Sequence, residues 1–269
     1  MGKLIGQFFL MTAGFFGVWF ALSQVPFVTD EKLAEMTATN EQRLGDMMME
    51  MITKTETEVK TDSAVAIVHE AKEKLCEAIG IEHSQIKLHV IYNSEVNAFA
   101  LPDSNLIVYT GLIAYCKNAD EMAGVMGHEL GHIVEGHVMK KLVKEVGLTM
   151  LGVLVGGNSG SEVLVEVFKT LTSSSFDRSQ EREADRLAVE YMLEANLDPE
   201  HLANFMFRLS QEDHAYPEFM EWVSTHPDSK DRSADILKLK NESDQTDFET
   251  LATDEEWETL KTRLNLNYL

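Results

Sequence analysis

The sequence Gly127-His128-Glu129-Leu130-Gly131-His132 contains an HExxH motif. On an α-helix, residues four apart share a face, so His128 and His132 place two imidazoles one turn apart. Neutral imidazole nitrogens bind Zn²⁺, and Glu129 is placed to take a proton from the attacking water. Chance also produces this short motif, so the flanking residues have to support it.

The flanking residues predict that a helix carries the motif. Asn118 followed by Glu121 has the pattern of a capping box. An apolar stripe at helical spacing follows, formed by Met122, Val125, Met126, Leu130 and Ile133. Glycines at 124, 127 and 131 each weaken a helix by roughly 1 kcal/mol relative to Ala. We therefore expect close packing against this helix rather than loose helix propensity.

A third metal ligand has to come from elsewhere in the chain. The metzincin pattern HExxHxxGxxH fails, because Glu135 stands at its glycine position and Val138 at its third histidine. In a continuous helix His137 points away from the metal face, so we expect a structural or surface residue there. The better candidate is Glu181, which shares a helix face with Asp185. Glu181 would complete a His₂Glu site and Asp185 would hydrogen-bond a ligand histidine, although a solvated acidic helix has the same composition.

Four motifs in this order resemble the HtpX and CAAX prenyl protease family of membrane-associated gluzincin zinc endopeptidases, which includes BepA-like quality-control proteases. They are NAFALP at 97–102 with TGL at 110–112, GHELGH at 127–132, ExxxD at 181–185, and His-Pro at 226–227 with an arginine at 232. The resemblance spans residues 63–232. It implies an α+β, zincin-like domain that is mainly helical with a small β-sheet.

The resemblance also implies roles for individual residues. One Zn²⁺ per chain would be bound by His128, His132 and Glu181, with Glu129 as the general base and Asp185 as a carboxylate supporting the ligands. His226 would be a catalytic residue that either stabilises the oxyanion or gates the zinc, and Arg232 would contribute to substrate binding. Without the resemblance, a histidine before a proline is an ordinary turn residue.

Alternating apolar residues predict three strands, at 85–92, 96–101 and 106–109, with a turn at 102–105. An exposed edge strand binds an extended peptide through main-chain hydrogen bonds. By resemblance that edge is Asn97, Ala98, Phe99 and Ala100. Ordinary core packing of these residues is the alternative, because Phe99 suits a core equally well.

Length and charge limit the classes of function. The 269 residues suit one domain with an appendage, and the net charge of -22 argues against nucleic acid and against adhesion to anionic lipid through the folded surface. Cys76 and Cys116 fit no zinc-thiolate pattern, and buried free thiols are more common than a bridge at this size.

The N-terminal segment, residues 1–28, predicts a membrane anchor. Residues 4–22 contain no charge and would reach roughly 28 Å as a helix, nearly a bilayer core. Lys3 before the stretch and Asp30 after it favour a single-pass inner-membrane protein with its catalytic domain on the periplasmic side. A cleaved signal peptide is the alternative, but the apolar stretch is long for one.

The remaining chain divides into a juxtamembrane helix or linker at 29–62 and a peptidase domain at 63–269. Residues 33–51 predict an amphipathic, Met-rich helix, either packed in the core or offering a flexible surface to clients. Residues 146–157 predict a core helix, and residues 163–171 between Gly- and Ser-rich segments predict a lid over the site.

Together these patterns predict a membrane-anchored zinc metalloendopeptidase that cleaves unfolded or extended polypeptides, and the resemblance implies envelope protein quality control. A proteolytically inactive, zinc-containing chaperone or membrane adaptor is the first alternative. An envelope protein in which HELGH is coincidental is the second. No oligomeric state follows from the sequence.

Overall fold

The computed structural model describes residues 30–266, apart from 61–62, 64, 157–160, 212–221, 223–224 and 228. The chain forms two compact units, residues 1–40 and 41–269, and the sheet and the candidate site belong to the second. Among the described helices, none is long and apolar enough to cross a bilayer. The predicted anchor at 4–22 lies outside the described residues.

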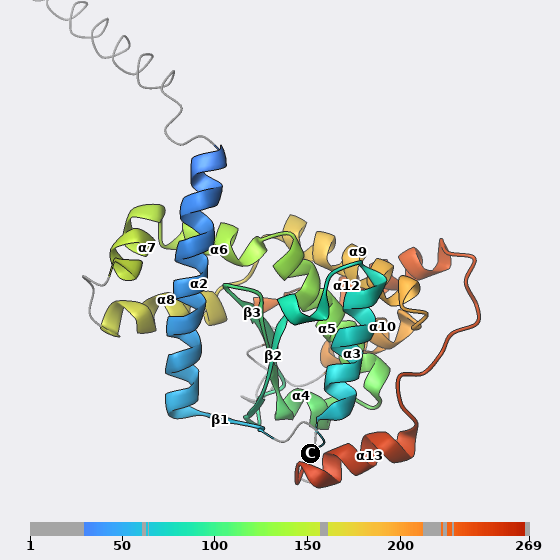
Figure 1. The fold of residues 1–269 in the computed structure, drawn as a ribbon. Coiled ribbons are helices and arrows are strands. Elements are labelled where there is room, and N and C mark those ends of the chain that lie inside the picture. Colours follow the sequence, from blue (N-terminus) through green and yellow to red (C-terminus); the bar gives the residue numbers. More distant parts are fainter. Residues whose placement is uncertain are drawn as a thin grey trace, which may run out of the picture. The chain divides into compact units, whose positions relative to one another are not determined.

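A four-stranded sheet forms the centre of the second unit, with strand order β1-β2-β4-β3 (Figure 1). The strands are β1 (Thr57–Glu58), β2 (Lys87–Tyr92), β3 (Ala98–Leu101) and β4 (Asn105–Tyr109). β2 and β4 are parallel, and β3 pairs antiparallel with β4 through a turn in which Asp103 and Ser104 have φ of 65° and 54°. The three predicted strands and their turn are therefore confirmed, and β3 lies at the sheet edge.

One side of the sheet is covered by the helices that carry the candidate site (Figure 1). They include α3 (Ala66–Ala78), α5 (Ala119–Val134), α9 (Arg178–Glu194), α10 (Glu200–Leu209) and α12 (Ser229–Asn241). Shorter elements complete this side: η2 (His83–Gln85), α4 (Thr110–Tyr115) and α13 (Asp254–Arg263). Their buried side chains form the larger apolar core, where Cys76 and Cys116 are free thiols as predicted.

A second apolar cluster covers the other face of the sheet. It joins Leu44, Met48 and Ile52 of α2 (Asp30–Thr55) to helices α6 (His137–Glu145), α7 (Leu148–Val155) and α8 (Ser161–Ser173). The predicted amphipathic helix is therefore confirmed from Leu44 to Ile52, and it packs in a core. Because both faces of the sheet are covered, the simple alternation expected for β2 fails: Ile91 is buried and Tyr92 is exposed.

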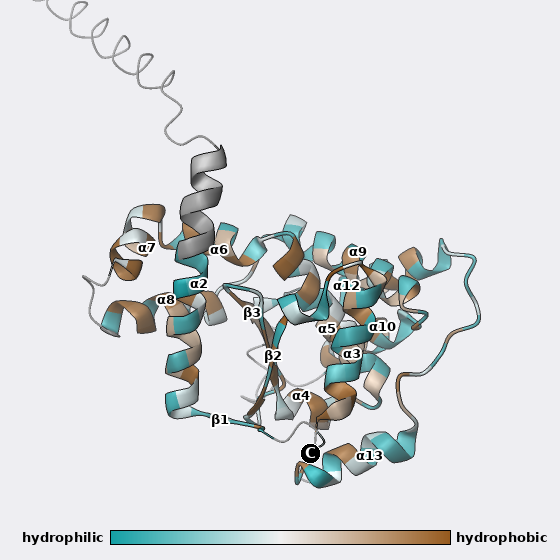
Figure 2. Cartoon of the chain, viewed as in Figure 1, coloured by the Kyte–Doolittle hydropathy of each residue, from teal (hydrophilic) through white to brown (hydrophobic). Residues whose placement is uncertain are grey.

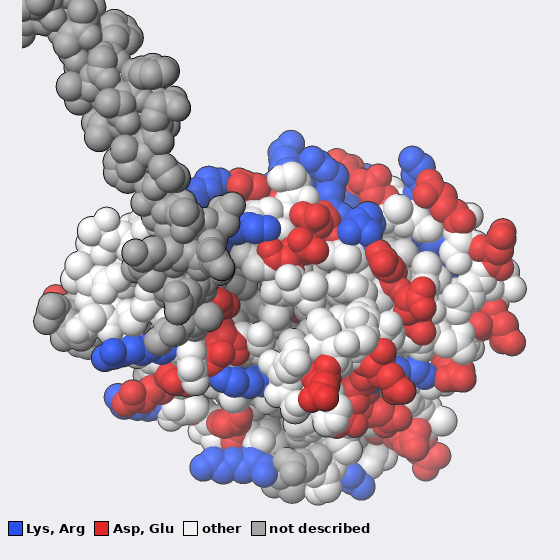
Figure 3. Space-filling model, turned by 45° about the horizontal axis from the view of Figure 1, so that its top comes forward, with Lys and Arg blue, Asp and Glu red and all other residues white. Residues whose placement is uncertain are grey.

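Helix α7 is only half buried, which corrects the prediction of a core helix at 146–157. Leu151 and Leu154 belong to the second cluster, but Leu148, Met150 and Val153 are 43–48% exposed. The hydrophobic colour along α7 in Figure 2 therefore belongs in part to residues that are exposed. Elsewhere, Figure 3 shows acidic side chains spread over the face it draws, with basic side chains in small groups between them.

Helix α5 begins where the sequence predicts. The Asn118 side chain accepts a hydrogen bond from the Glu121 N–H at 2.9 Å. The Glu121 carboxylate accepts from the Lys117 N–H at 2.8 Å rather than from Asn118, and it also binds Arg208, so the capping box is incomplete. The N-terminus of the helix is still capped by Asn118, and the Glu121 carboxylate accepts from the N–H of Lys117 instead of that of Asn118.

The three glycines of α5 face neighbouring helices, as predicted. A Cβ at Gly124 would lie 2.7 Å from the Leu202 Cβ, and one at Gly131 would lie 3.1 Å from the Ala184 Cα. At Gly127 the nearest atom would be the Ala188 Cα, at an ordinary 3.7 Å. Gly124 and Gly131 therefore allow the close approach of α10 and α9 to α5.

These contacts predict opposite effects of two similar substitutions. Gly124→Ala should lower the free energy of unfolding by about 1–3 kcal/mol, because its methyl group overlaps a rigid Cβ. Gly127→Ala should leave it unchanged or raise it by up to about 1 kcal/mol through helix propensity. Denaturant unfolding of both variants measures the difference, and equal destabilisation would contradict this account of the packing.

Candidate metal centre

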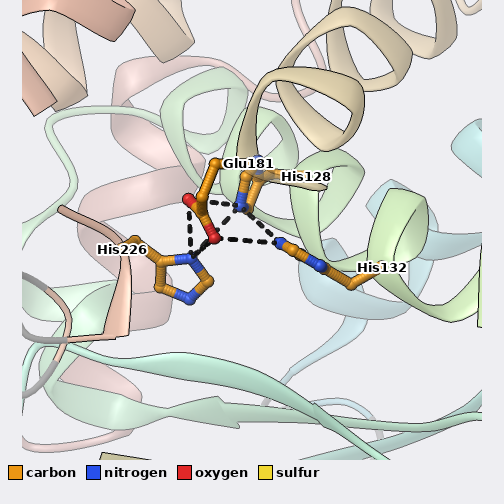
Figure 4. A group of neighbouring side chains, drawn as sticks. All are labelled: His128, His132, Glu181 and His226. Carbon is orange, nitrogen blue, oxygen red and sulfur yellow. Dashed lines mark hydrogen bonds and ion pairs between the residues drawn. The ribbon is translucent and has the colours of Figure 1, made fainter. Parts of the chain in front are cut away.

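Four side chains from three parts of the chain converge at one point (Figure 4). His128 and His132 project from successive turns of α5, Glu181 projects from the first turn of α9, and His226 lies just before α12. One ligand atom from each lies within 4.8 Å of all the others, and the four side chains are buried. The structure thus brings together the three predicted metal ligands and adds His226 to them.

The distances between the ligand atoms suit a tetrahedral ion. Zn–N and Zn–O bonds of about 2.0–2.1 Å place tetrahedral ligand atoms roughly 3.3–3.4 Å apart. His128 Nε2 lies 3.1 Å from His132 Nε2 and 3.3 Å from His226 Nδ1. Glu181 Oε1 lies 3.5 Å from His132 Nε2 and 3.1 Å from His226 Nδ1. Three nitrogens and one carboxylate oxygen therefore surround a space of the size that such an ion needs.

The protonation states also suit a cation. Burial lowers the pKa of His132 to about 3 and that of His226 to about 4, and it lowers that of His128, so all three imidazoles are neutral near pH 7. Burial alone would raise the pKa of Glu181, but His226 and Arg232 hold it well below its usual value. Neutral imidazoles and an ionised carboxylate are the forms that bind metal.

Arg232 lies behind the ligands in a buried ion-pair network. Its guanidinium donates to both oxygens of Asp185, at 2.7 and 2.6 Å, and lies 2.5 Å from Glu181. Asp185 also lies 3.0 Å from His128 Nδ1, the nitrogen on the outer side of that ligand. Burial raises the pKa of Asp185, but Arg232 outweighs it and brings the pKa to about 2. Arg232, predicted to bind substrate, is buried among these carboxylates instead of facing open solvent.

Charge around the cluster is unbalanced without a cation. Glu181 and Asp185 are buried there as ionised carboxylates, and Arg232 is the only described lysine or arginine that forms an ion pair with either of them. Burying an uncompensated carboxylate costs several kcal/mol, on the order of the desolvation penalty for one ion. A bound dication would remove the imbalance, so the residues present fit such an ion.

The edge strand β3 lies against Glu129. The Ala100 N–H donates to Glu129 Oε2 at 3.1 Å, and Glu129 Oε1 lies 3.5 Å from His226 Nε2. Asn97, Ala98 and Ala100 are buried, and Phe99 is half-buried. The structure therefore places the predicted peptide-binding residues on the sheet edge next to the predicted general base.

Two aromatic rings that the sequence reasoning missed enclose the ligands. Phe176 stacks on His132 with ring centroids 3.9 Å apart, and Trp222 stacks on His226 at 4.2 Å. Lys141 Nζ donates to the Leu171 carbonyl at 2.8 Å and lies 4.1 Å from the Phe176 ring. Leu171, the last residue of the predicted lid, is thereby attached to α6, and Phe176, beyond that segment, contacts a ligand. No sequence pattern marked Phe176, because a lone aromatic after a Ser-rich segment has no characteristic spacing.

His137 is buried next to a ligand. Its Nδ1 lies 3.1 Å from His132 Nδ1, on the side of the ring away from the other ligand atoms. It is not one of the four convergent residues. As expected, His137 does not point to the ligand atoms. It does contact the outer side of one ligand, His132, which was not expected.

A helix-borne HExxH with a downstream glutamate on a second helix, beside a small sheet whose edge strand contacts the glutamate of the motif, defines a gluzincin-type metallopeptidase fold. The sequence model of Peptidase family M48 matches residues 63–240. The chain belongs to this family. The resemblance seen in the four motifs is thereby confirmed.

Curated relatives match the same part of the chain. The beta-barrel assembly-enhancing protease of Yersinia pestis is 26% identical over 166 residues, which are 57% of this chain and 34% of that protein. The mitochondrial metalloendopeptidase OMA1 of Schizosaccharomyces pombe is 30% identical over 158 residues, 57% of this chain and 46% of that protein. The bovine OMA1 is 26% identical over 199 residues, 69% of this chain and 38% of that protein. The chain thus spans less than half the length of these relatives.

Removing one ligand should weaken metal binding without unfolding the domain. Glu181→Ala takes away the only carboxylate among the four convergent residues. We expect the purified variant to retain much less metal than the wild type, measured by elemental analysis after dialysis against a weak chelator. Glu190→Ala, at an exposed position of the same helix, is the control and should retain metal normally. Full occupancy of Glu181→Ala would move the third ligand elsewhere.

The buried Lys141 predicts a pH dependence of stability. Burial lowers its pKa from 10.5 to about 8. Between these values the unfolded chain holds a proton that the folded chain has released, so the free energy of unfolding rises with pH across this window. The contribution is roughly 3 kcal/mol over the whole window.

Denaturant unfolding from pH 7.5 to 10.5 measures this rise as the difference between the wild type and Lys141→Met, which cannot titrate. Lys140→Met, at the exposed neighbouring position, should show the wild-type pH dependence. A difference between the wild type and Lys141→Met that stays constant across this range would contradict the prediction.

Proposed function

We propose that this chain is a zinc-dependent metalloendopeptidase that hydrolyses peptide bonds in extended or unfolded polypeptides. The observation that carries the proposal is the convergence of His128, His132 and Glu181 with the Glu129 carboxylate placed between them and an edge strand. No rearrangement of α5, α9 or β3 is needed to assemble these groups. This geometry supports the proposed activity, and membership of Peptidase family M48 is consistent with it.

The chemistry divides between the ion and the protein. A bound Zn²⁺ would polarise the scissile carbonyl and make the attacking water more acidic. Glu129 accepts the proton of that water and returns it to the leaving amine. Its Oε1 makes no hydrogen bond to any described residue and lies 3.5 Å from His226 Nε2. Burial raises the pKa of Glu129 well above its usual value, and Glu181 adds to the increase, so Glu129 is a stronger base than an exposed carboxylate.

An extended polypeptide is the substrate that the edge strand suits best. β3 pairs with β4 on one side only among the described strands, so its other side offers main-chain groups for an added strand. Main-chain recognition does not depend on side-chain identity, which favours unfolded clients of varied sequence. The Ala100 N–H is engaged by Glu129 and the Asn97 carbonyl accepts from the Tyr109 N–H of β4, so Ala98 is the edge residue left to position the peptide.

His226 occupies the fourth ligand position, which supports gating over oxyanion stabilisation as its role. Catalytic zinc sites keep one position open for water or substrate, whereas closed sites with four protein ligands are structural. His226 Nδ1 lies among the other ligand atoms, so its imidazole has to leave that position before a substrate carbonyl can occupy it. The enclosed state described here is therefore the resting form of the proposed enzyme.

The N-terminal segment and the relatives support a proposal about where in the cell the protein acts. Residues 4–22 are the proposed single-pass anchor at the inner membrane, with the domain of residues 63–269 on the extracytoplasmic side. The relatives are named as a protease that enhances beta-barrel assembly and as mitochondrial metalloendopeptidases. These names support a role in the quality control of envelope proteins as part of this proposal.

Replacing the general base should separate metal binding from catalysis. Glu129→Gln keeps the shape of the side chain but cannot accept the proton, so zinc should stay bound while cleavage of casein falls by at least about a hundredfold. Gel-based cleavage assays with and without chelator, alongside zinc analysis, measure both quantities. Glu135→Gln, on the same stretch of chain but away from the cluster, is the control and should cleave normally.

Three results would overturn the proposal. Unchanged turnover by Glu129→Gln would remove the assigned mechanism. A wild-type protein that binds zinc and unfolded casein but never cleaves it would favour an inactive chaperone or adaptor. Absence of zinc from protein purified without added metal would favour a coincidental HELGH motif.

A further inference from the structure

The outer nitrogen of His132 has a protein partner that no motif identified. His132 Nε2 faces the other ligand atoms, whereas its Nδ1 lies 3.1 Å from His137 Nδ1. Both rings are buried. The second nitrogen of a metal-bound imidazole needs a hydrogen-bond acceptor, because that bond fixes the tautomer and the orientation of the ring.

His137 is in turn bonded to a carboxylate on another helix. Its Nε2 lies 3.4 Å from Glu183 Oε2 on α9. If Nε2 of His132 binds the metal, Nδ1 of His132 carries its proton and donates to His137 Nδ1. The proton of His137 then lies on Nε2 and is donated to Glu183. One assignment of protons satisfies both contacts, so the three side chains form a single directed chain of hydrogen bonds.

The break between α5 and α6 explains how His137 reaches His132. α5 ends at Val134, and Gly136 adopts a left-handed conformation with φ of 62° before α6 begins at His137. A Cβ at Gly136 would meet no atom within 4 Å, so the glycine is required by its backbone conformation. In a continuous helix His137 would point away from His132. The turn at Gly136 returns it to the outer side of that ligand.

The same arrangement exists at the other ligand histidine. His128 Nδ1 lies 3.0 Å from Asp185 Oδ1. α9 therefore supplies three acidic side chains within five residues, each next to a different imidazole system: Glu181 at the ligand atoms, Asp185 behind His128, and Glu183 behind His137. This pattern distinguishes Glu183, which is 44% exposed, from an ordinary solvated glutamate.

We propose that His137 and Glu183 are positioning residues that hold His132 in the orientation required for metal binding. The inference rests on the proposed zinc site and extends it from HExxH to HExxHxxxxH, with Glu183 as the outermost member. Neither residue contacts the ion or the substrate. Their effect is on the affinity for zinc, through the ring orientation and basicity of His132.

Two substitutions at His137 separate hydrogen bonding from packing. His137→Asn places an amide oxygen close to the position of Nδ1, so the bond from His132 is kept. His137→Phe fills the same buried space but accepts no hydrogen bond. We expect His137→Phe to weaken zinc binding roughly 10–100-fold and His137→Asn to stay close to the wild type. Competition with a fluorescent chelator measures the zinc affinity, and the visible spectrum of the cobalt-substituted protein reports the geometry at the ligands.

Glu183→Ala tests the outer link at a half-exposed position where folding is not threatened. It should weaken zinc binding less than His137→Phe, because His137 itself is still present. Glu190→Ala on the same helix removes a carboxylate of similar exposure, which among the described residues pairs with Arg186, and it should leave zinc affinity unchanged. Circular dichroism of every variant confirms that the helices are retained.

The outcomes distinguish this inference from the proposed function. If the wild type binds no zinc, the proposed function fails. If the wild type binds zinc and folded His137→Phe binds it equally well, only the positioning role fails. Equal losses in His137→Phe and His137→Asn would show that packing, not the hydrogen bond, is responsible, and would also overturn the inference. If neither His137 variant folds, wild-type zinc affinity in Glu183→Ala would overturn the inference.

Discussion

The close approach of α5 and α9 is the constraint on which the site depends. Glycine at 131 lets the backbone of α9 pass where a side chain would otherwise stand. That approach brings Glu181 to the two histidines of α5, although the residues are far apart in sequence. Because the helices are also held by the apolar core, the ligand atoms are arranged before any ion arrives. The free energy needed to bring the buried charges together is supplied by folding, so metal binding does not have to supply it.

Buried electrostatics then decide what the site can hold. Arg232 offsets part of the charge of Glu181 and Asp185, which keeps both ionised in a place where burial alone would protonate them. The remaining negative charge is matched to a dication. Glu129 forms no ion pair with Arg232; one of its oxygens accepts from the edge strand and the other lies 3.5 Å from His226 Nε2. Two buried glutamates thus fit the two different roles proposed for them, Glu181 as a metal ligand and Glu129 as the general base.

Short sequence patterns correctly predicted the helices and strands whose formation depends on neighbouring residues in the chain. The helix after Asn118, the three strands and the metal-ligating positions of α5 and α9 follow from caps, alternation and fixed spacing. The same reasoning failed where tertiary packing decides the outcome. α2 covers the second face of the sheet and buries Ile91, and α7 is left half exposed. His137 is not one of the convergent residues, as expected, but its contact with His132 was not predicted, because it depends on left-handed Gly136, which interrupts the helix assumed for it.

The central claim is that three imidazoles and one carboxylate of this chain converge to hold a single zinc ion. X-ray absorption spectroscopy at the zinc edge, on protein purified with its own metal, tests this claim most directly. The account predicts one zinc per chain with only nitrogen and oxygen neighbours, and a multiple-scattering pattern of about three imidazoles. Sulfur neighbours, or a zinc site with no imidazole signature, would contradict it.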